Sequence, residues 1–175
     1  MENHSTGKPK LVLNPRIGYG EKFWPASRTA DLLCKCQQDY GFEIWIIAGL
    51  TDQDYVKEIT DRMKGERPNT ISLLELDKLG EIISSCNLFI GPDGGTSRLA
   101  ASLGVPCIIL FGPTKPFAWP GRAGARNEII WKGLPCSPCS PEYRRSCRSR
   151  ECFTAISIDE VISRIEKIFA YIAEQ

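Results

Sequence analysis

A glycine turn with charged neighbours is the part of this sequence whose residue types point most directly to chemistry. The turn comprises Asp93, Gly94, Gly95 and Thr96, with Arg98 just beyond it. Two glycines let a ligand approach the backbone closely, and free N–H groups at the start of a helix bind phosphate through hydrogen bonds and the helix dipole. The arginine could add a bidentate contact to the same anion. We therefore expect an anion site, with the threonine or the serine after it as helix cap; a tight turn capped by the aspartate is the alternative.

Two other loops contain polar residues that could reach the same ligand. In one loop Lys22 follows Gly18 and Gly20, and its side chain could reach a diphosphate. In the other, Thr114 follows a Gly-Pro pair, so its hydroxyl could point toward the same place. A solvated lysine and a rigid turn are the ordinary alternatives. Because the three loops carry complementary groups, together they favour a phosphate-binding site.

The elements that must position these loops alternate between buried strands and amphipathic helices. Continuous apolar strands that alternate with such helices indicate a parallel sheet covered on both faces, and right-handed crossovers make it a doubly wound, Rossmann-like α/β layer. In such a sheet the ligand lies beyond the carboxyl ends of the strands, where the three loops begin. We expect strands over residues 10–14, 43–49, 70–73, 88–91 and 107–111, and helices over about 24–41, 52–64, 77–85, 97–103 and 158–173.

Composition and charge narrow the class of protein. The chain has 175 residues, and a polar leader over residues 1–9 precedes what we expect to be one domain over residues 10–175. The single histidine, His4, lies in that leader, which argues against Ser-His-Asp or Cys-His catalysis and against a His-rich metal site. Lys plus Arg number 22 against 21 for Asp plus Glu, so no global charge favours nucleic acid or anionic lipid. With no signal peptide and no apolar run of ~20 residues, we expect a cytoplasmic protein without a transmembrane segment. Peripheral attachment to the inner face of the membrane is compatible with this expectation.

Residues 115–155 show no convincing period, and four of the eight cysteines crowd into residues 134–153. A Cys-x-x-Cys pair suits tetrahedral zinc, and a structural zinc would staple a loop that lacks secondary structure. A disulfide and free thiols are the alternatives. The other four cysteines are expected to behave as small buried hydrophobes. The crowded cysteines are Cys136, Cys139, Cys147 and Cys152, and the scattered ones are Cys34, Cys36, Cys86 and Cys107.

Arginines surround the third crowded cysteine. They could meet a phosphorylated lipid acceptor or an anionic membrane surface, or form a zinc-ribbon-like contact with nucleic acid. A solvated basic loop is the ordinary alternative. The four are Arg144, Arg145, Arg148 and Arg150.

Taken in order, these loops resemble glycosyltransferase family 9, the heptosyltransferase family of lipopolysaccharide assembly. The stretches that carry the resemblance are GEKFWP at 20–25, FIGPDGGTSRLAA at 89–101 and VPCIILFGPTKP at 105–116, with the Cys-Ser-Pro-Cys run after them. The resemblance covers about residues 10–170. It implies that the chain is the C-terminal, donor-binding half of a two-domain GT-B enzyme.

The resemblance also assigns roles to residues. It implies that Lys22 contacts the donor diphosphate, with Arg98 beside it stabilising the leaving group, and that Asp93 holds hydroxyls of the donor sugar. Arg98 stands where the family usually has histidine, and Gly94 where it has serine or threonine. The resemblance also implies that Gly94, Gly95 and Thr96 lie around the phosphates, Leu73 and Leu74 at the nucleotide base, and Asp52 or Asp54 at the ribose. Gly18 and Thr114, from the other two loops, complete the substrate-binding residues that we expect.

The activity implied is inverting transfer from a nucleotide-diphosphate sugar, ADP-heptose or similar, to a cell-surface glycan or lipid-linked lipopolysaccharide core, with no cofactor required. In the family the acceptor site and the carboxylate base belong to an N-terminal domain, which we do not find before Lys10. We therefore expect nucleotide-sugar binding but little transfer unless that domain or a partner chain is present. The alternatives are a non-catalytic nucleotide-sugar-binding module that acts with a partner chain, and a nucleic-acid-binding protein with a four-cysteine metal site.

Overall fold

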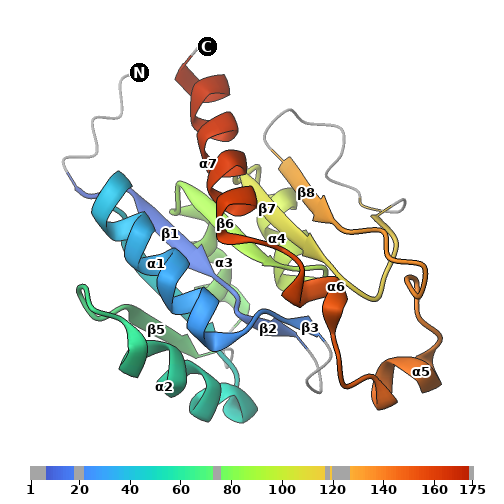
Figure 1. Ribbon diagram of the computed structural model, residues 1–175. Coiled ribbons are helices and arrows are strands. Elements are labelled where there is room, and N and C mark those ends of the chain that lie inside the picture. The colour runs from blue at the N-terminus through green and yellow to red at the C-terminus, as the bar shows by residue number, and fades with distance from the viewer. Residues whose placement is uncertain (1–6, 18–21, 73–75, 117–118, 120–126, 174–175) are drawn as a thin grey trace.

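Six parallel strands form the sheet on which the molecule is built (Figure 1). The computed structural model describes residues 7–17, 22–72, 76–116, 119 and 127–173. The strand order is β5-β4-β1-β6-β7-β8, which is 3-2-1-4-5-6 in chain order and therefore the Rossmann order. The expected doubly wound parallel sheet is confirmed. The strands are β1 Lys10–Leu13, β4 Glu43–Ala48, β5 Asn69–Ser72, β6 Leu88–Pro92, β7 Cys107–Phe111 and β8 Asn127–Trp131.

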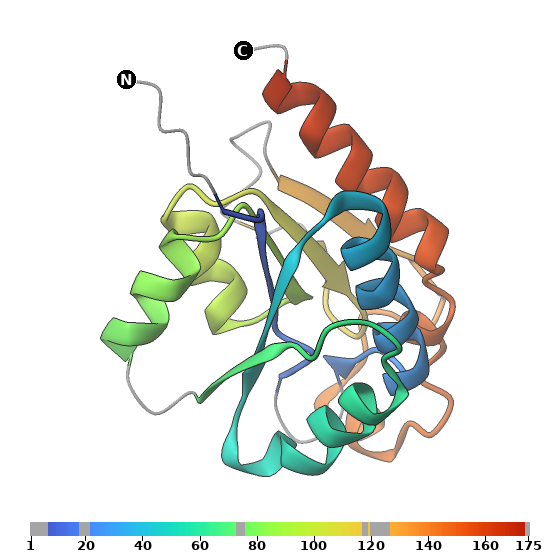
Figure 2. The same cartoon turned by 90° about the vertical axis from the view of Figure 1, so that its left-hand side faces the viewer.

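Helices cover both faces of this sheet. Figure 2 shows α3 and α4 on one side of the sheet and α1 and α7 on the other. Among the described residues, no helix is long and apolar enough to cross a membrane. The helices are α1 Ala26–Tyr40, α2 Gln53–Arg62, α3 Leu76–Ser84, α4 Gly95–Ser102, α5 Pro141–Ser146, α6 Glu151–Thr154 and α7 Ile158–Ala173, with a 3-10 turn η1 at Leu50–Asp52.

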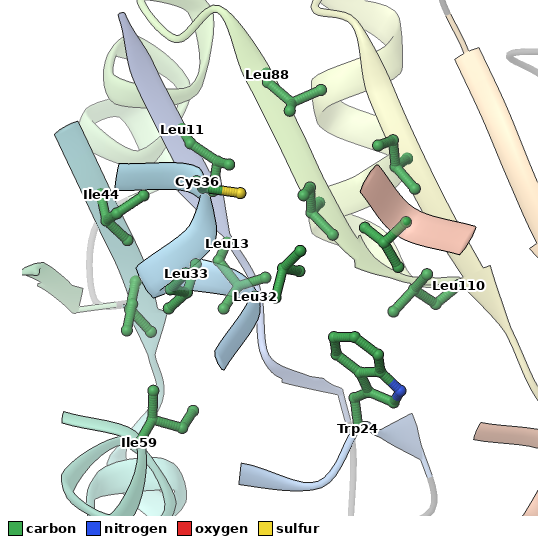
Figure 3. Close-up of a cluster of buried hydrophobic side chains, with 14 of the residues drawn as sticks. Leu11, Leu13, Trp24, Leu32, Leu33, Cys36, Ile44, Ile59, Leu88 and Leu110 are labelled. Atoms are coloured by element: carbon green, nitrogen blue, oxygen red, sulfur yellow. The ribbon is translucent and has the colours of Figure 1, made fainter. Parts of the chain in front are cut away.

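Two hydrophobic clusters hold the layers together because side chains alternate along each strand. In β1, Leu11 and Leu13 face the cluster that also contains residues of α1, α2 and α7, whereas Val12 faces the cluster under α3 and α4. Figure 3 shows Leu32 and Leu33 of α1 beside the β1 leucines. The sheet is thus buried on both faces, as its continuous apolar strands indicated.

Three of the four scattered cysteines belong to these clusters. Cys36, Cys86 and Cys107 are buried, and burial raises the pKa of Cys36 and of Cys86 to about 12. The prediction that they act as small hydrophobes is confirmed for these three. Cys34 is half-buried, and its sulfur accepts a hydrogen bond from the Lys64 N–H at 3.4 Å.

The expected strands and helices are present to within a few residues, but two parts of the chain differ. A short hairpin, β2 Arg16–Ile17 with β3 Lys22–Phe23, lies where we expected only a loop. The segment 115–155, which shows no period, contains β8, α5 and α6. Only Ile130 of β8 is buried, because β8 is an edge strand, and this is why a strand pattern is missing from its sequence.

Candidate ligand site at the carboxyl edge of the sheet

The candidate site lies between the carboxyl ends of β1 and β6, where the strand order of the sheet reverses. Asn14 follows β1, and its backbone N–H donates to the carbonyl of Ile90 at 2.9 Å. Its side-chain Nδ2 donates to the hydroxyl of Thr96, at the start of α4, at 2.5 Å. Open α/β sheets bind ligands in the crevice at this reversal point. Asn14 therefore links the end of β1 to the end of β6 and to the start of α4 through hydrogen bonds.

The start of α4 has no side-chain cap among the described residues. The N-cap is Gly94, in an extended conformation, and α4 begins at Gly95. The expected capping by Thr96 or Ser97 is wrong, because both residues lie inside the first turn and both hydroxyls have other partners. Thr96 accepts from Asn14, and the Ser97 hydroxyl donates to the carbonyl of Pro92 at 2.6 Å. Uncapped N–H groups and the positive end of the helix dipole are thereby left for an anion.

Asp93 contacts Arg98 and Thr114, and the sequence predicted all three residues for the site. The Arg98 guanidinium donates to its Oδ1 at 3.3 Å, and the Thr114 hydroxyl donates to its Oδ2 at 3.0 Å. The aspartate is 8% exposed, and a carboxylate so deeply buried needs such donors. The loops after β6 and β7 and the first turn of α4 therefore meet at one carboxylate.

Trp119 holds the arginine from another side and was not among the predicted site residues. The Arg98 Cζ lies 5.4 Å from the centre of the indole ring. The indole is buried and packs edge-on against Phe111, with ring centres 6.0 Å apart. A cation over a fixed aromatic face is attracted to it, so Trp119 and Asp93 together orient the guanidinium. Asn14 was also missed, although a polar residue directly after a buried strand was a signal for it.

Asp52, predicted at the ribose, is engaged in its own turn. Its Oδ2 accepts a hydrogen bond from the Gly49 N–H at 3.0 Å, which closes the η1 turn after β4. Asp54 is exposed in the first turn of α2. Lys22 belongs to β3, but its side chain is not among the described ones. Gly18, Leu73 and Leu74 lie outside the described residues, so their contacts stay predictions.

The four crowded cysteines lie close enough together to influence one another. Burial, followed by the neighbouring thiols, raises the pKa of Cys152 to about 11. The Arg150 N–H and the Ser149 hydroxyl lower the pKa of Cys147. In the described part of the chain, however, no three His, Cys, Asp or Glu side chains are arranged to hold a metal ion.

Local contacts explain that arrangement of the thiols. The Cys139 thiol donates to the carbonyl of Cys136 at 3.1 Å, and the Cys147 sulfur lies 3.8 Å from the Ser149 hydroxyl. These two thiols are thus directed to neighbouring oxygens rather than to one shared point. Metal binding by this segment stays a prediction.

Comparison with known protein sequences identifies the family to which this chain is similar. The sequence model of glycosyltransferase family 9 (heptosyltransferase) matches residues 1–149. Lipooligosaccharide heptosyltransferase 2 of Campylobacter jejuni is 27% identical over 168 residues, which cover 93% of this chain and 51% of that protein. The chain thus spans about half the length of the curated relatives it matches.

Solved structures agree on the fold. The glycosyltransferase family 9 structure from Veillonella parvula aligns with a TM-score of 0.78 at 22% identity, over 94% of this chain and 46% of that one. ADP-heptose LPS heptosyltransferase II of Escherichia coli aligns with a TM-score of 0.74 at 19% identity, over 97% and 49%. The expected Rossmann-like half of a GT-B glycosyltransferase is confirmed. The match of the family model to most of the chain, on a sheet of the same fold, shows that this chain belongs to glycosyltransferase family 9, the heptosyltransferase family.

Proposed function

We propose that this chain is the donor-binding half of a heptosyltransferase-like enzyme and binds a nucleotide-diphosphate sugar at the carboxyl edge of its sheet. The observation that carries the proposal is the cluster of Asp93, Arg98 and Thr114 beside the uncapped start of α4. ADP-heptose is the donor we propose, because a structural relative is named as an ADP-heptose heptosyltransferase. The acceptor we propose is a lipid-linked core glycan, with the reaction in the cytoplasm.

The diphosphate would lie against the first turn of α4. Its negative charges would meet the free backbone N–H groups, the helix dipole and the Arg98 guanidinium. The Arg98 side chain is 48% exposed, so its charge is accessible to a ligand. Lys22, from the β2–β3 hairpin, is the second cation that we propose for the same group.

These groups suit departure of a nucleoside diphosphate. In an inverting transfer an acceptor hydroxyl oxygen forms a bond to the anomeric carbon as the bond from that carbon to the diphosphate oxygen breaks. The electron pair of the broken bond stays on the diphosphate, where Arg98 and the α4 dipole stabilise the added charge. The proton of the acceptor hydroxyl must pass to a base. The family resemblance places that base in the other half of the enzyme.

Asp93 has a second role beside the sugar contact that the resemblance implies. Both of its oxygens accept hydrogen bonds from side chains of the same site. Without it, Arg98 would lose its ion pair and Thr114 its acceptor. We therefore propose that Asp93 sets the position of the cation that meets the diphosphate.

Calorimetric titration with ADP and with ADP-heptose tests the proposal. Arg98→Ala should weaken both by about tenfold to a hundredfold, the value of a charge-assisted hydrogen bond. The matched control is Arg62→Ala, which removes an exposed arginine of α2 that pairs with Glu58. A wild-type chain that binds neither ligand, or an Arg98→Ala variant that binds both normally, would contradict the proposal.

A non-catalytic module that works with a partner chain would bind the same ligands. Turnover separates it from the enzyme. The enzyme proposal requires sugar transfer once an acceptor-binding half is supplied, whereas a binding module stays inactive. Membership in family 9 favours the enzyme over the nucleic-acid-binding alternative.

A further inference from the structure

Three residues of the cysteine-rich segment 134–153 contact the short turn that precedes Thr114. The Ser137 hydroxyl donates to the carbonyl of Gly112 at 2.7 Å, and the Cys139 N–H donates to the carbonyl of Pro113 at 3.0 Å. The ring of Phe153, from α6, lies so near that a Cβ on Gly112 would come within 2.2 Å of it. One segment therefore supports this turn through three contacts.

Thr114, the residue after this turn, contacts the ligand site through Asp93. Thr114 donates its hydroxyl to Asp93 Oδ2, and Asp93 in turn holds Arg98. Gly112 and Pro113 are both buried, so their carbonyls depend on donors from the protein. A shift of the turn would therefore move the Thr114 hydroxyl relative to the carboxylate.

The Ser137 hydroxyl has a defined direction. The indole Nε1 of Trp131 lies 3.4 Å from it and, as an N–H, can only donate. The serine oxygen accepts a hydrogen bond from that N–H and donates its own proton to the carbonyl of Gly112. The backbone of Trp131 pairs with Phe111 at the carboxyl ends of β8 and β7, and its side chain packs against the hydrophobic cluster on that face of the sheet. The end of the edge strand thereby orients a hydroxyl that supports the site.

We infer that Ser137 is a positioning residue of the ligand site: it holds the Gly112–Pro113 turn so that Thr114 stays on Asp93. This role rests on the proposed function, because the affected contact belongs to the donor site. Removing the hydroxyl leaves the buried Gly112 carbonyl without that donor and lets the turn sample other positions. A ligand must then order the turn as it binds, which lowers its affinity.

The test compares five forms of the full chain: the wild type and four variants. Ser137→Ala removes the hydroxyl, and Ser137→Thr retains one. The matched control is Ser146→Ala, whose hydroxyl bonds only to carbonyls of its own helix, α5, among the contacts seen in the described residues. Two quantities are measured: hydrogen exchange of the peptide that spans residues 112–115, and the Kd of ADP by calorimetry.

Ser137→Ala should speed exchange of that peptide and raise the Kd about threefold to tenfold, the value of one hydroxyl hydrogen bond. Ser137→Thr should return both to within about twofold of wild type, and Ser146→Ala should change neither. In a further variant, Trp131→Phe removes the indole N–H that orients the serine and keeps an aromatic ring at that position, although a smaller one. It should shift both quantities in the same direction by a smaller amount.

The outcomes separate this role from the proposed function. If wild type binds no ADP, the proposed function fails and the positioning role fails with it. If wild type binds ADP and Ser137→Ala leaves either the exchange or the Kd unchanged, only the positioning role is overturned. Failure of Ser137→Thr to restore binding in a folded variant would also overturn it.

Discussion

Asp93 and Arg98 form an ion pair whose two members differ in exposure. Their Oδ1 and Nη2 atoms lie 3.3 Å apart, and the Asp93 side chain is 11% exposed whereas that of Arg98 is 48% exposed. The carboxylate therefore lies inside the protein, and the guanidinium reaches solvent beside the start of α4. Asp93 is therefore suited to hold Arg98 in place, and Arg98 is suited to contact a ligand. Substituting either residue should affect ligand binding through the other.

The first prediction concerns coupling within this pair. Asp93→Asn should weaken ADP binding about threefold to tenfold, because the arginine loses its ion pair. In an Arg98→Ala background the same change should add less than about a twofold loss, since nothing remains for it to position. Calorimetry on the wild type, the two single variants and the double variant measures this, with Asp61→Asn on α2 as control. Fully additive losses would show instead that Asp93 contacts the ligand independently of Arg98.

The second prediction separates charge from geometry at Asn14. Asn14→Asp reverses the hydrogen bond, because the new carboxylate accepts from the Thr96 hydroxyl, to which the Asn14 amide now donates. The carboxylate is also favoured by the positive end of the α4 dipole, so the fold should stay as stable. The same charge should repel a diphosphate and raise the Kd of ADP about tenfold. Asn14→Ala, which removes the hydrogen bond to Thr96 without adding a charge, should raise the Kd of ADP about threefold.

The matched control for Asn14 lies at the other end of the same strands. The Asn87 side chain accepts a hydrogen bond from the Lys10 N–H at 2.8 Å, where β1 begins. Asn87→Asp adds the same charge far from the start of α4 and should leave ADP binding unchanged. Equal effects of the two aspartates would argue against an anion site beside Asn14.

The third prediction concerns the contact between Gly112 and Phe153. A Cβ at position 112 would come within 2.2 Å of the ring, so Gly112→Ala should destabilise the protein by about 1–3 kcal/mol through overpacking. Adding Phe153→Leu should recover part of that loss. Gly80→Ala in α3 is the control: its Cβ would meet nothing within 4 Å, and it should stabilise by about 0.5–1 kcal/mol. Urea unfolding measures all four forms, and an unaffected Gly112→Ala would refute the close contact.

The fourth prediction follows from the capping box at the start of α7. The Ser157 N–H donates to Glu160 Oε2 at 2.9 Å, the Glu160 N–H donates to Ser157 Oγ at 3.1 Å, and Lys132 donates to Glu160 Oε1 at 2.8 Å. The hydrogen bonds from Lys132 and then from the Ser157 N–H lower the pKa of Glu160 below its ordinary value of 4.5. A lowered pKa means that this stabilisation is complete above the ordinary value and is lost as the pH falls through the lower value of the folded state.

Glu160→Gln should therefore reduce stability near pH 7 and make the remaining stability less dependent on pH below about 4.5. Because both partners are partly exposed, we expect a loss of at most about 1 kcal/mol. Urea unfolding across this pH range measures it, with Glu58→Gln on α2 as control. Parallel curves for wild type and Glu160→Gln would contradict the capping role.

The fifth prediction is zinc binding by Cys136, Cys139, Cys147 and Cys152. Elemental analysis of protein prepared under reducing conditions should give about one zinc per chain, and Cys136→Ser with Cys139→Ser should abolish it. Zinc would replace the thiol protons, so Cys139 and Cys147 must turn from their present oxygen partners toward the metal. Cys34→Ser, outside the segment, should retain the metal. Metal-free wild type would identify these residues as free thiols.

Several features were predictable because their signals are local. The β7 residues form a continuous apolar run and the α7 residues show a helical period, and the bounds expected for both elements are those observed. The turn at Asp93 was predictable as well, since two glycines and a charged residue mark it in the sequence alone. Its neighbours Arg98 and Thr114 were predicted as ligands of the same site, because each follows a strand that ends at one edge.

Other features needed the tertiary structure because they depend on contacts between distant residues. The hydrogen bond from Asn14 to Thr96 joins residues 82 positions apart, and only the pairing of β1 with β6 brings them together. The support of Gly112 by Ser137 requires β8, whose edge position leaves no clear period. The sequence by itself determined five strands of the sheet, the five longer helices and which loops carry charge, since periodicity depends on neighbouring residues. The partners of each polar side chain were decided by the packing of the sheet and helices, because hydrogen bonds require positions that no local pattern encodes.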